Sequence, residues 1–239
     1  MSEFQWFYPV VIDVIKEAHN IRRFFLKFED LESYNFSAGQ YVKVEFPIPS
    51  KKNYRQYSIA SRPDGTNVIE LLIVLDPNGL ATNYLFNNVD IGSTLKVSKP
   101  MGNFIIKDID SPEFVFISTG TGLAPLRSMY LDMIYKQNYK GKITVIFGTR
   151  YMKDMIYLDE FQELSKMENF EFIPVLSREN SAEWTGEKGY VHKIYKEKYS
   201  EKNNSTFYIC GWKDMVTETR QNLLSLGYDR KQVNFERYN

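Results

Sequence analysis

The sequence predicts two domains of different class, an antiparallel β-barrel followed by a parallel α/β domain. Three observations lead to this prediction. The period of the apolar pattern changes near residue 110, the first half consists of short strand-like runs between turn-forming residues, and the second half alternates strand-like with helical segments. With 239 residues, 43% of them hydrophobic, the chain can bury one large core or two modest ones.

The first half has six runs with the composition of short β-strands. They cover residues 9–15, 23–28, 41–46, 54–60, 69–75 and 94–98. Turn formers such as Ser37-Ala38-Gly39 separate them. With one short helix near residues 81–86, these runs predict a closed, six-stranded antiparallel barrel.

After Ser111-Pro112, strands and helices alternate. The predicted strands cover residues 114–118, 143–147, 170–176, 207–210 and 233–238, and the predicted helices cover residues 123–137, 154–167, 191–198 and 214–226. Five strands in this alternation predict a five-stranded, doubly wound parallel sheet. Ligands bind such sheets beyond the carboxyl ends of the strands, at the switch point, which the first and fourth strands flank in the order 3-2-1-4-5.

The segments expected at that switch point suit a nucleotide. After the first strand the sequence reads S-T-G-T-G-L-A-P, in which Gly120 and Gly122 allow a tight turn and the following helix offers free N–H groups to a pyrophosphate. Pro125 is tolerated in the first turn of that helix. A Gly-x-Gly turn alone is equally typical of an ordinary strand–helix connection. A lone cysteine at the end of a buried strand, such as Cys210, is more often a core residue than a chemical group.

Composition excludes several classes of function. Thirty Lys and Arg balance thirty Asp and Glu, so the chain lacks the charge excess that nonspecific nucleic-acid or membrane binding needs. One cysteine and two histidines cannot form a Cys-rich zinc site or hold an iron–sulfur cluster, so we expect no metal and an organic cofactor for any electron transfer. Without a signal-peptide pattern or a long apolar stretch, we expect a cytoplasmic monomer with no nucleic-acid or membrane partner.

Three runs together resemble the motifs of the ferredoxin–NADP(H) reductase superfamily. They are R-Q-Y-S (residues 55–58), G-T-G-L-A-P (residues 120–125) and Y-I-C-G-W-K-D-M-V (residues 208–216), in this order and spacing. The resemblance covers essentially the whole chain. It implies an FAD-binding β-barrel domain over residues 1–110 and an NAD(P)-binding α/β domain over residues 111–239.

The R-x-Y-S motif implies flavin contacts. It assigns Arg55 to the flavin phosphates, Tyr57 to packing against the flavin, and Ser58 to a hydrogen bond near flavin N5. Because side chains alternate along a strand, Arg55 and Tyr57 should share one face and Ser58 should lie on the other. Further flavin contacts are implied for Gln56, the backbone of Leu72, Ile73 and Val74, and the turn and helix start with Gly79, Ala81 and Thr82. A helix-capping role explains Thr82 equally well.

The resemblance also implies a nicotinamide-nucleotide site. Its residues would be Thr119, Gly120, Thr121 and Gly122 around the pyrophosphate and nicotinamide, Cys210 and Gly211 at the fourth strand, and Arg150, Ser177, Arg178, Lys188 and Tyr190 for the 2′-phosphate. Cations and hydrogen-bond donors at this last group, with no acidic residue opening the loops, favour NADP(H). The run W-T-G-E-K-G-Y-V (residues 184–191) is also similar to NADH-using oxygenase reductases, so NAD(H) stays open.

The C-terminal run V-N-F-E-R-Y-N resembles the plant-type ending of the superfamily. That ending implies Glu236 near the nicotinamide and Tyr238 over the flavin, although the plant-type tyrosine is the last residue and here Asn239 follows it. The candidate catalytic residues are therefore Ser58, Cys210, Glu236 and Tyr238.

The implied activity is that of an FAD-dependent oxidoreductase. It would transfer electrons between NADP(H) and a one-electron protein carrier, with ferredoxin or flavodoxin as the expected partner. Two alternatives stay open: an NADH-dependent flavin or oxygenase reductase component, and a noncatalytic flavin-binding subunit.

Overall fold

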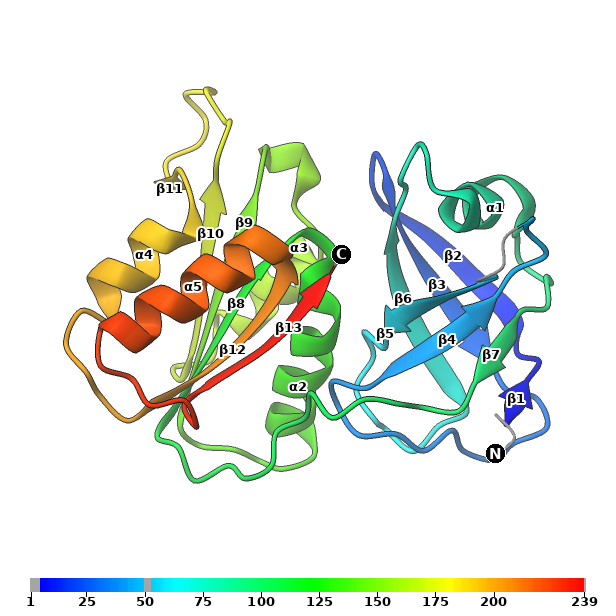
Figure 1. Ribbon diagram of the computed structural model, residues 1–239, viewed down its shortest axis with the longest axis horizontal. Helices are drawn as coiled ribbons and strands as arrows, with labels where there is room; N and C mark the ends of the chain where they lie inside the picture. Colours follow the sequence, from blue (N-terminus) through cyan, green and yellow to red (C-terminus); the bar gives the residue numbers. More distant parts are fainter. Residues whose placement is uncertain (1–4, 50–52, 239) are drawn as a thin grey trace. The chain divides into compact units, whose positions relative to one another are not determined.

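The computed structural model describes residues 5–49 and 53–238, and Figure 1 labels their helices and strands. These residues form two compact units. One ends at Ile105 and also includes Arg127–Lys136, and the other contains Ile106–Leu126 and the chain from Gln137 onward. Helix α2, Leu123–Tyr135, therefore contributes its first residues to one unit and the remainder to the other.

The first unit is built from two small antiparallel sheets. Among its described residues, one sheet has the four-strand order β1-β7-β4-β5 and the other the three-strand order β2-β3-β6. Isolated β-bridges link the sheets, between Val10 and Thr94 and between Ile59 and Leu71. The strands are β1 Trp6–Phe7, β2 Val10–Ala18, β3 Ile21–Lys27, β4 Tyr41–Glu45, β5 Tyr54–Ser58, β6 Val68–Val74 and β7 Lys96–Ser98, and the helix α1 covers Leu80–Asn88.

The prediction of one closed, six-stranded barrel is wrong in two respects. The strands are divided between two sheets, and β1 adds a short strand within the described chain. The register of β2 against β3 shifts between Val11 and Asp13 and again between Lys16 and Ala18, and such irregularities bend a strand and interrupt its ladder. A two-residue strand such as β1 is too short to show an alternating pattern.

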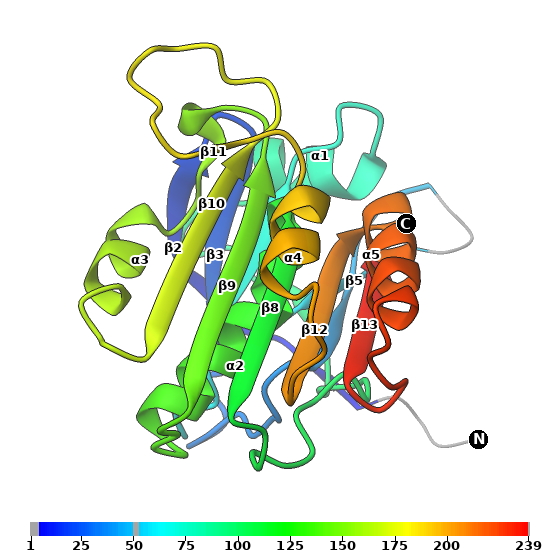
Figure 2. The same ribbon diagram turned by 90° about the vertical axis from the view of Figure 1, so that its left-hand side faces the viewer.

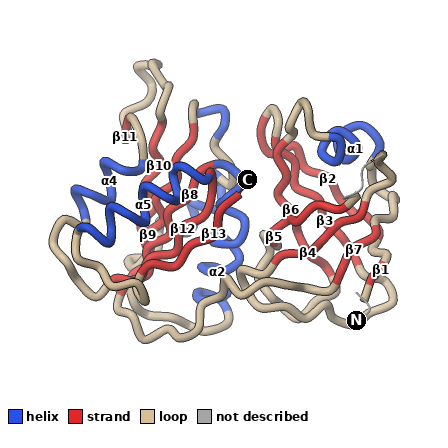
Figure 3. The backbone as a smooth tube through the Cα atoms, in the orientation of Figure 1, coloured by secondary structure: helices blue, strands red, loops and turns tan. Residues whose placement is uncertain are grey.

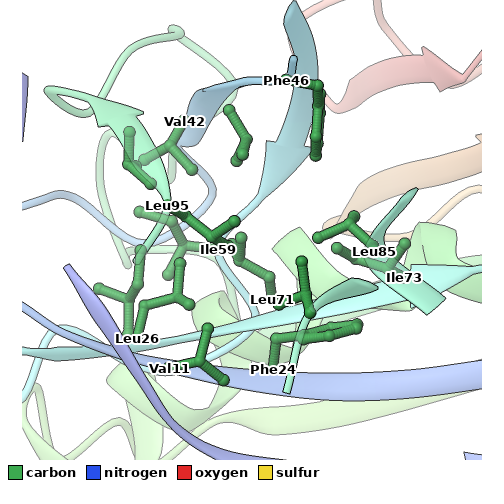
Figure 4. Close-up of a cluster of buried hydrophobic side chains, with 14 of the residues drawn as sticks. Val11, Phe24, Leu26, Val42, Phe46, Ile59, Leu71, Ile73, Leu85 and Leu95 are labelled. Atoms are coloured by element: carbon green, nitrogen blue, oxygen red, sulfur yellow. The ribbon is translucent and has the colours of Figure 1, made fainter. Parts of the chain in front are cut away.

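The two sheets enclose a single apolar core, shown in Figure 4. Helix α1 contributes Leu85 to this core, and strands β3 and β4 contribute Phe24 and Val42. Each such side chain stabilises the fold by about 1.5–3 kcal/mol when it leaves water completely. The helix is thereby fixed to the same core that holds β5 and β6.

A buried carboxylate, Glu70 on β6, connects this core to the helical segment Arg127–Lys136 of the same unit. Arg23 Nε donates to Glu70 Oε1 at 2.7 Å, and Arg127 Nη1 donates to Glu70 Oε2 at 3.1 Å. Arg127 Nη1 also donates to the carbonyl oxygen of Ala60 at 2.8 Å. The side chains of Glu70 and Arg127 are only 3% and 9% exposed, so both charges depend on these partners rather than on water.

The second unit contains a parallel sheet with the order β11-β10-β9-β8-β12-β13, which Figure 2 shows from the side of α4 and α5. Strand β8 lies next to β12, so the predicted order and switch point are confirmed. The strands are β8 Glu113–Thr119, β9 Lys142–Thr149, β10 Phe170–Leu176, β11 Glu187–Lys188, β12 Ser205–Trp212 and β13 Val233–Tyr238. The other elements are α3 Leu158–Leu164, α4 Val191–Lys198, α5 Lys213–Ser225 and the 3₁₀ turns η1 Gly120–Gly122 and η2 Met152–Asp154.

Two predictions for this unit are wrong in detail. The sheet has six strands in the described chain rather than five, because Glu187 and Lys188 pair with Val175 and Leu176 as β11. Two exposed polar residues have no apolar period that could reveal them as a strand. The helix predicted over residues 154–167 is shorter, because Tyr157 adopts a left-handed conformation with φ 53° and α3 begins only after it.

Helices cover both faces of this sheet (Figures 2 and 3). On one face, Ile194 of α4 and Val216 of α5 share a buried cluster with Ile117 of β8. On the opposite face, the ring of Phe161 in α3 stacks on Phe172 in β10, with 3.8 Å between the centroids. Burial on both faces explains the nearly continuous apolar strands of this half of the sequence.

No helix in the described parts of the chain is long and apolar enough to cross a lipid bilayer. In the same residues, no group of three or more His, Cys, Asp or Glu side chains is arranged to hold a metal ion.

Replacing Glu70 by glutamine should lower the free energy of unfolding by about 3–5 kcal/mol, because removal of one member of a buried ion pair leaves its partners uncompensated. Urea denaturation followed by circular dichroism would measure this loss. The matched control is Glu45→Gln. Glu45 accepts a hydrogen bond from Lys96 at 2.9 Å, but the two side chains are 28% and 32% exposed, so this variant should lose much less stability. Equal losses in the two variants would contradict the role of Glu70.

Candidate functional site

Strand β5 presents the R-Q-Y-S residues as strand alternation predicts. Tyr57 is paired with Val42 of β4, and Ser58 is paired with Tyr41. Because directly opposed residues of antiparallel strands share a face, Arg55 and Tyr57 lie on the face of the buried Val42, and Ser58 lies on the other.

The hydroxyl of Tyr57 is suited to a bound group. Its Oη is buried and has no hydrogen-bond partner in the described part of the structure. Burial raises the pKa of Tyr57, and the Arg55 guanidinium lowers it in part, so the hydroxyl is neutral at physiological pH. A buried hydroxyl without a partner costs about 1–3 kcal/mol. A neutral hydroxyl beside a guanidinium fits a flavin, which carries both hydrogen-bonding atoms and phosphates.

The turn before α1 holds Thr82 differently. Thr82 Oγ1 donates to the carbonyl oxygen of Gly79 at 3.2 Å and accepts the Asp76 N–H at 3.2 Å. A Cβ atom on Gly79 would lie 2.9 Å from that same Oγ1, so a larger residue there would displace the Thr82 or Asp76 side chain. The N-cap of α1 is Gly79 and no side chain among the described residues caps this helix, so the Thr82 hydroxyl is held by the backbone of the turn without acting as a helix cap.

Three of the positions expected to contact the flavin have side chains in the core. Leu72, Ile73 and Ala81 are buried, so any contact that they make with a cofactor comes from their backbone.

At the carboxyl ends of β8 and β12, two backbone segments approach each other more closely than side chains allow. A Cβ atom on Gly122 would lie 2.5 Å from the carbonyl oxygen of Cys210 and 2.5 Å from the Cα atom of Gly211. A Cβ atom on Gly211 would lie 2.6 Å from Thr119 Oγ1. Gly120 has open space beside it but adopts φ 53°, which favours glycine.

Two hydroxyl groups at this edge of the sheet lack protein partners. Ser118 Oγ and Thr119 Oγ1 are buried and have no hydrogen-bond partner among the residues that the structure describes. The turn η1 and helix α2 follow directly, so the positive end of a helix dipole lies in the same place. Unpaired hydroxyls beside a glycine turn and a helix start fit the pyrophosphate of a dinucleotide.

Basic residues lie at the neighbouring strand ends. The N–H of Ser177 donates to the Thr149 carbonyl oxygen, and the N–H of Arg178 to that of Arg150, both at 3.0 Å. The structure therefore brings Arg150, Ser177 and Arg178 together, with both arginines exposed. Lys188 is paired with Leu176 in β11, and Tyr190, just before α4, is 71% exposed.

Cys210, Glu236 and Tyr238 form one group at the switch point. Cys210 on β12 is paired with Glu236 on β13. Burial raises the pKa of the Cys210 thiol, the Glu236 charge raises it further, and a hydrogen bond with Tyr238 opposes them. The thiol is therefore protonated and unsuited to act as a base or nucleophile.

Two polar residues of this edge, Ser118 and Glu179, were not among the site residues predicted from the sequence. Glu179 Oε2 accepts the N–H of Met152 at 3.0 Å, although the two residues lie 27 positions apart in the sequence. No local pattern predicts such a contact. Ser118 could have been identified from its position at the start of the S-T-G-T-G run, just before the glycine turn.

Both halves of the chain match known domain families. Residues 10–106 match the model described as "Oxidoreductase FAD-binding domain", and residues 116–221 match "Oxidoreductase NAD-binding domain".

Named relatives agree with these matches. The chain is 35% identical over 224 residues to ferredoxin–NADP reductase B of Sorangium cellulosum (strain So ce56), covering 89% of this chain and 90% of that protein. It is 30% identical over 189 residues to the anthranilate 1,2-dioxygenase electron transfer component of Acinetobacter baylyi (strain ATCC 33305 / BD413 / ADP1), covering 79% of this chain and only 54% of that longer protein.

The fold is similar to that of a solved ferredoxin NADP+ reductase from Neisseria gonorrhoeae with bound FAD and NADP. The TM-score is 0.82, with 24% sequence identity and 99% of each chain covered.

Replacing Thr119 by valine should weaken nucleotide binding by about tenfold to a hundredfold, the loss expected for one hydrogen bond to a charged phosphate oxygen. The thermal unfolding temperature of the flavin-loaded protein should stay unchanged or rise, because the variant removes a buried hydroxyl that has no partner in the described structure. Nucleotide titration and thermal unfolding would measure the two effects.

The matched control is Thr144→Val in the same sheet. Thr144 Oγ1 donates to Glu113 Oε1 at 2.8 Å, so this variant should lower stability and leave nucleotide binding unchanged. A Thr119→Val protein with reduced stability and normal nucleotide affinity would contradict the assignment.

Proposed function

Because the chain belongs to the ferredoxin–NADP(H) reductase superfamily, we propose that it transfers electrons between NADP(H) and a one-electron protein carrier such as ferredoxin or flavodoxin. Its FAD-binding and NAD-binding domains make it a flavin- and nicotinamide-dependent oxidoreductase. The observation that carries the choice of acceptor is the match over 89% of this chain and 90% of ferredoxin–NADP reductase B. We propose residues 1–110 as the FAD-binding domain and residues 111–239 as the NAD(P)-binding domain.

The first unit would bind FAD through β5 and its neighbours. The Arg55 guanidinium would hold the flavin phosphates, and Tyr57 would pack against the flavin with its hydroxyl bonded to the cofactor. Ser58 would donate its hydroxyl near N5, and the backbone around Ile73 and Gly79 would provide further N–H and C=O groups. When bound, FAD supplies the exchange between two-electron and one-electron transfer.

The second unit would bind the nicotinamide nucleotide at its switch point. The glycine turn after β8 and the Thr119 hydroxyl would hold the pyrophosphate. Arg150, Arg178 and Lys188 would bind the 2′-phosphate that distinguishes NADPH from NADH, because guanidinium and ammonium groups pair strongly with phosphate oxygens.

The group at β12 and β13 would act on the nicotinamide end of the nucleotide. The protonated Cys210 thiol would position the ring, and the Glu236 carboxylate would hold or release a proton beside it. We propose from the family resemblance that Tyr238 covers the flavin until the nicotinamide takes its place.

Anaerobic reduction of the purified flavoprotein tests this function. NADPH should bleach the flavin faster than NADH, and the reduced protein should pass electrons to ferredoxin or flavodoxin. Turnover only with NADH and an oxygenase partner would favour the second candidate, which the similarity to the anthranilate dioxygenase component and the run over residues 184–191 support. A yellow protein that neither nucleotide bleaches would be a noncatalytic flavin-binding subunit.

Arg55→Ala should weaken FAD retention by about tenfold to a hundredfold, because it removes a charge-assisted hydrogen bond of about 1.5–3 kcal/mol. Fluorescence titration of the flavin-free protein with FAD would measure the affinity. The control is Arg62→Ala, whose guanidinium lies over the Tyr135 ring in the same unit, 5.5 Å from the centroid. Equal loss in both variants, or release of FMN rather than FAD on heating, would contradict the assignment.

Arg178→Ala should raise the KM for NADPH by roughly tenfold and scarcely change the KM for NADH, because NADH lacks the phosphate that Arg178 would bind. Steady-state kinetics with an artificial acceptor would measure both. Lys166→Ala serves as the control, since Lys166 is paired with Glu163 on the protein surface at 2.7 Å. Equal increases for the two coenzymes would remove Arg178 from the specificity site.

A further inference from the structure

The loops that follow β9 and β10 are joined beyond the ends of their strands. Just past the last ladder pair, two backbone hydrogen bonds join these segments, from Ser177 N–H to the Thr149 carbonyl oxygen and from Arg178 N–H to the Arg150 carbonyl oxygen, both at 3.0 Å. One side chain, Glu179, extends the connection. Its Oε2 accepts the N–H of Met152 at 3.0 Å, in the turn η2 that follows β9. Its Oε1 accepts the N–H of Ser181 at 2.9 Å, in the loop that follows β10.

This carboxylate is held in its charged form by the backbone. The N–H groups of Met152 and Ser181 lower the pKa of Glu179, and the charge of Lys188 lowers it further. A carboxylate that accepts one N–H from each of two loops resists any change in their spacing. Both of its oxygen atoms are engaged with the protein's own backbone.

Glu179 is close to the basic residues at this edge of the sheet. Arg178 directly precedes it, and Arg150 lies two residues before Met152. Lys188 is close enough for its charge to act on the carboxylate. The spacing of these cations therefore depends on two backbone segments that Glu179 ties together.

The far part of the β10 loop has its own support. Trp184 Nε1 donates to the carbonyl oxygen of Glu187 at 3.0 Å, and a Cβ atom on Gly186 would lie 2.5 Å from the Trp184 ring. A change at Glu179 should therefore loosen the start of the loop and leave its end, and the unit as a whole, folded.

We propose that Glu179 is a positioning residue for coenzyme choice, which holds the two loops at the spacing that lets Arg150 and Arg178 meet the same 2′-phosphate. This inference rests on the proposed preference for NADPH. Acidic side chains at such loops commonly bind the ribose hydroxyls of NAD. Glu179 has the opposite role, because its two oxygens bind loop N–H groups and so build a phosphate site instead of a ribose site.

Glu179→Gln tests the proposal. Glutamine keeps the length of the side chain, but its amide nitrogen cannot accept a hydrogen bond, so one of the two N–H groups loses its partner. We expect the KM for NADPH to rise by roughly tenfold, with kcat and the KM for NADH changed less than about twofold. The matched control is Glu183→Gln, an exposed acidic residue of the same loop, which should leave all three values unchanged.

Amide hydrogen exchange gives a second readout that needs no nucleotide. In the FAD-loaded protein, the N–H groups of Met152 and Ser181 should exchange faster in Glu179→Gln than in the wild type, and at the wild-type rate in Glu183→Gln. Unchanged exchange at both positions would overturn the proposal whatever the kinetics show.

The kinetic outcomes separate this proposal from the proposed function. Faster exchange together with equal KM increases for NADPH and NADH, or with no KM increase for either, would overturn the proposal. It would mean that the connection Glu179 makes between the two loops does not affect binding of the 2′-phosphate. A rise confined to NADH would mean that Glu179 itself binds the ribose, and would also overturn it. A preference of the wild-type protein for NADH would count against the proposed function, and it is measured before any variant is made.

Discussion

A close backbone approach in the α/β unit, between Gly122 and the Cys210–Gly211 peptide, determines the geometry at the carboxyl ends of β8 and β12. Any side chain on Gly122 would meet main-chain atoms, which cannot move aside as a flexible side chain could. The contact fixes the turn η1 against β12, so helix α2 begins at the switch point. The missing side chain of Gly211 leaves room for the Thr119 hydroxyl, which is buried and has no hydrogen-bond partner among the described residues.

Periodicity predicted the parts of the fold that bury a repeating apolar face. The alternation of strands and helices in the second half and the bounds of α4 follow from such patterns. The strand order came from the general doubly wound fold, and the two faces of β5 from the alternation of side chains along a strand. Strand β11 could not be predicted, because Glu187 and Lys188 are exposed and join the sheet only through their backbone. The contact between Glu179 and Met152 joins loops 27 residues apart, and no local rule relates them. Gly120 was predictable because its φ of 53° is a local requirement, whereas the requirement for glycine at Gly122 comes from contact with the distant Cys210 and Gly211.

Two carboxylates that differ in burial affect the protein in different ways: one affects its stability and the other the conformation of two loops. Glu70 is enclosed between Arg23 and Arg127, so removing its charge would lower the stability of the first unit. Glu179 is partly exposed and bonded to N–H groups of irregular backbone, so its effect is on the shape of loops. A sequence presents both as ordinary acidic residues, and only the structure separates the two.

The single cysteine of the chain has a practical consequence. Cys210 is completely buried in the strand at the switch point, and its raised pKa keeps the reactive thiolate scarce. Alkylating agents and peroxides attack the thiolate, so modification requires β12 to become accessible and its surroundings to open. The rate at which iodoacetamide labels the native protein therefore measures how often this edge of the sheet opens. The measurement needs no introduced probe, and no second thiol has to be removed first.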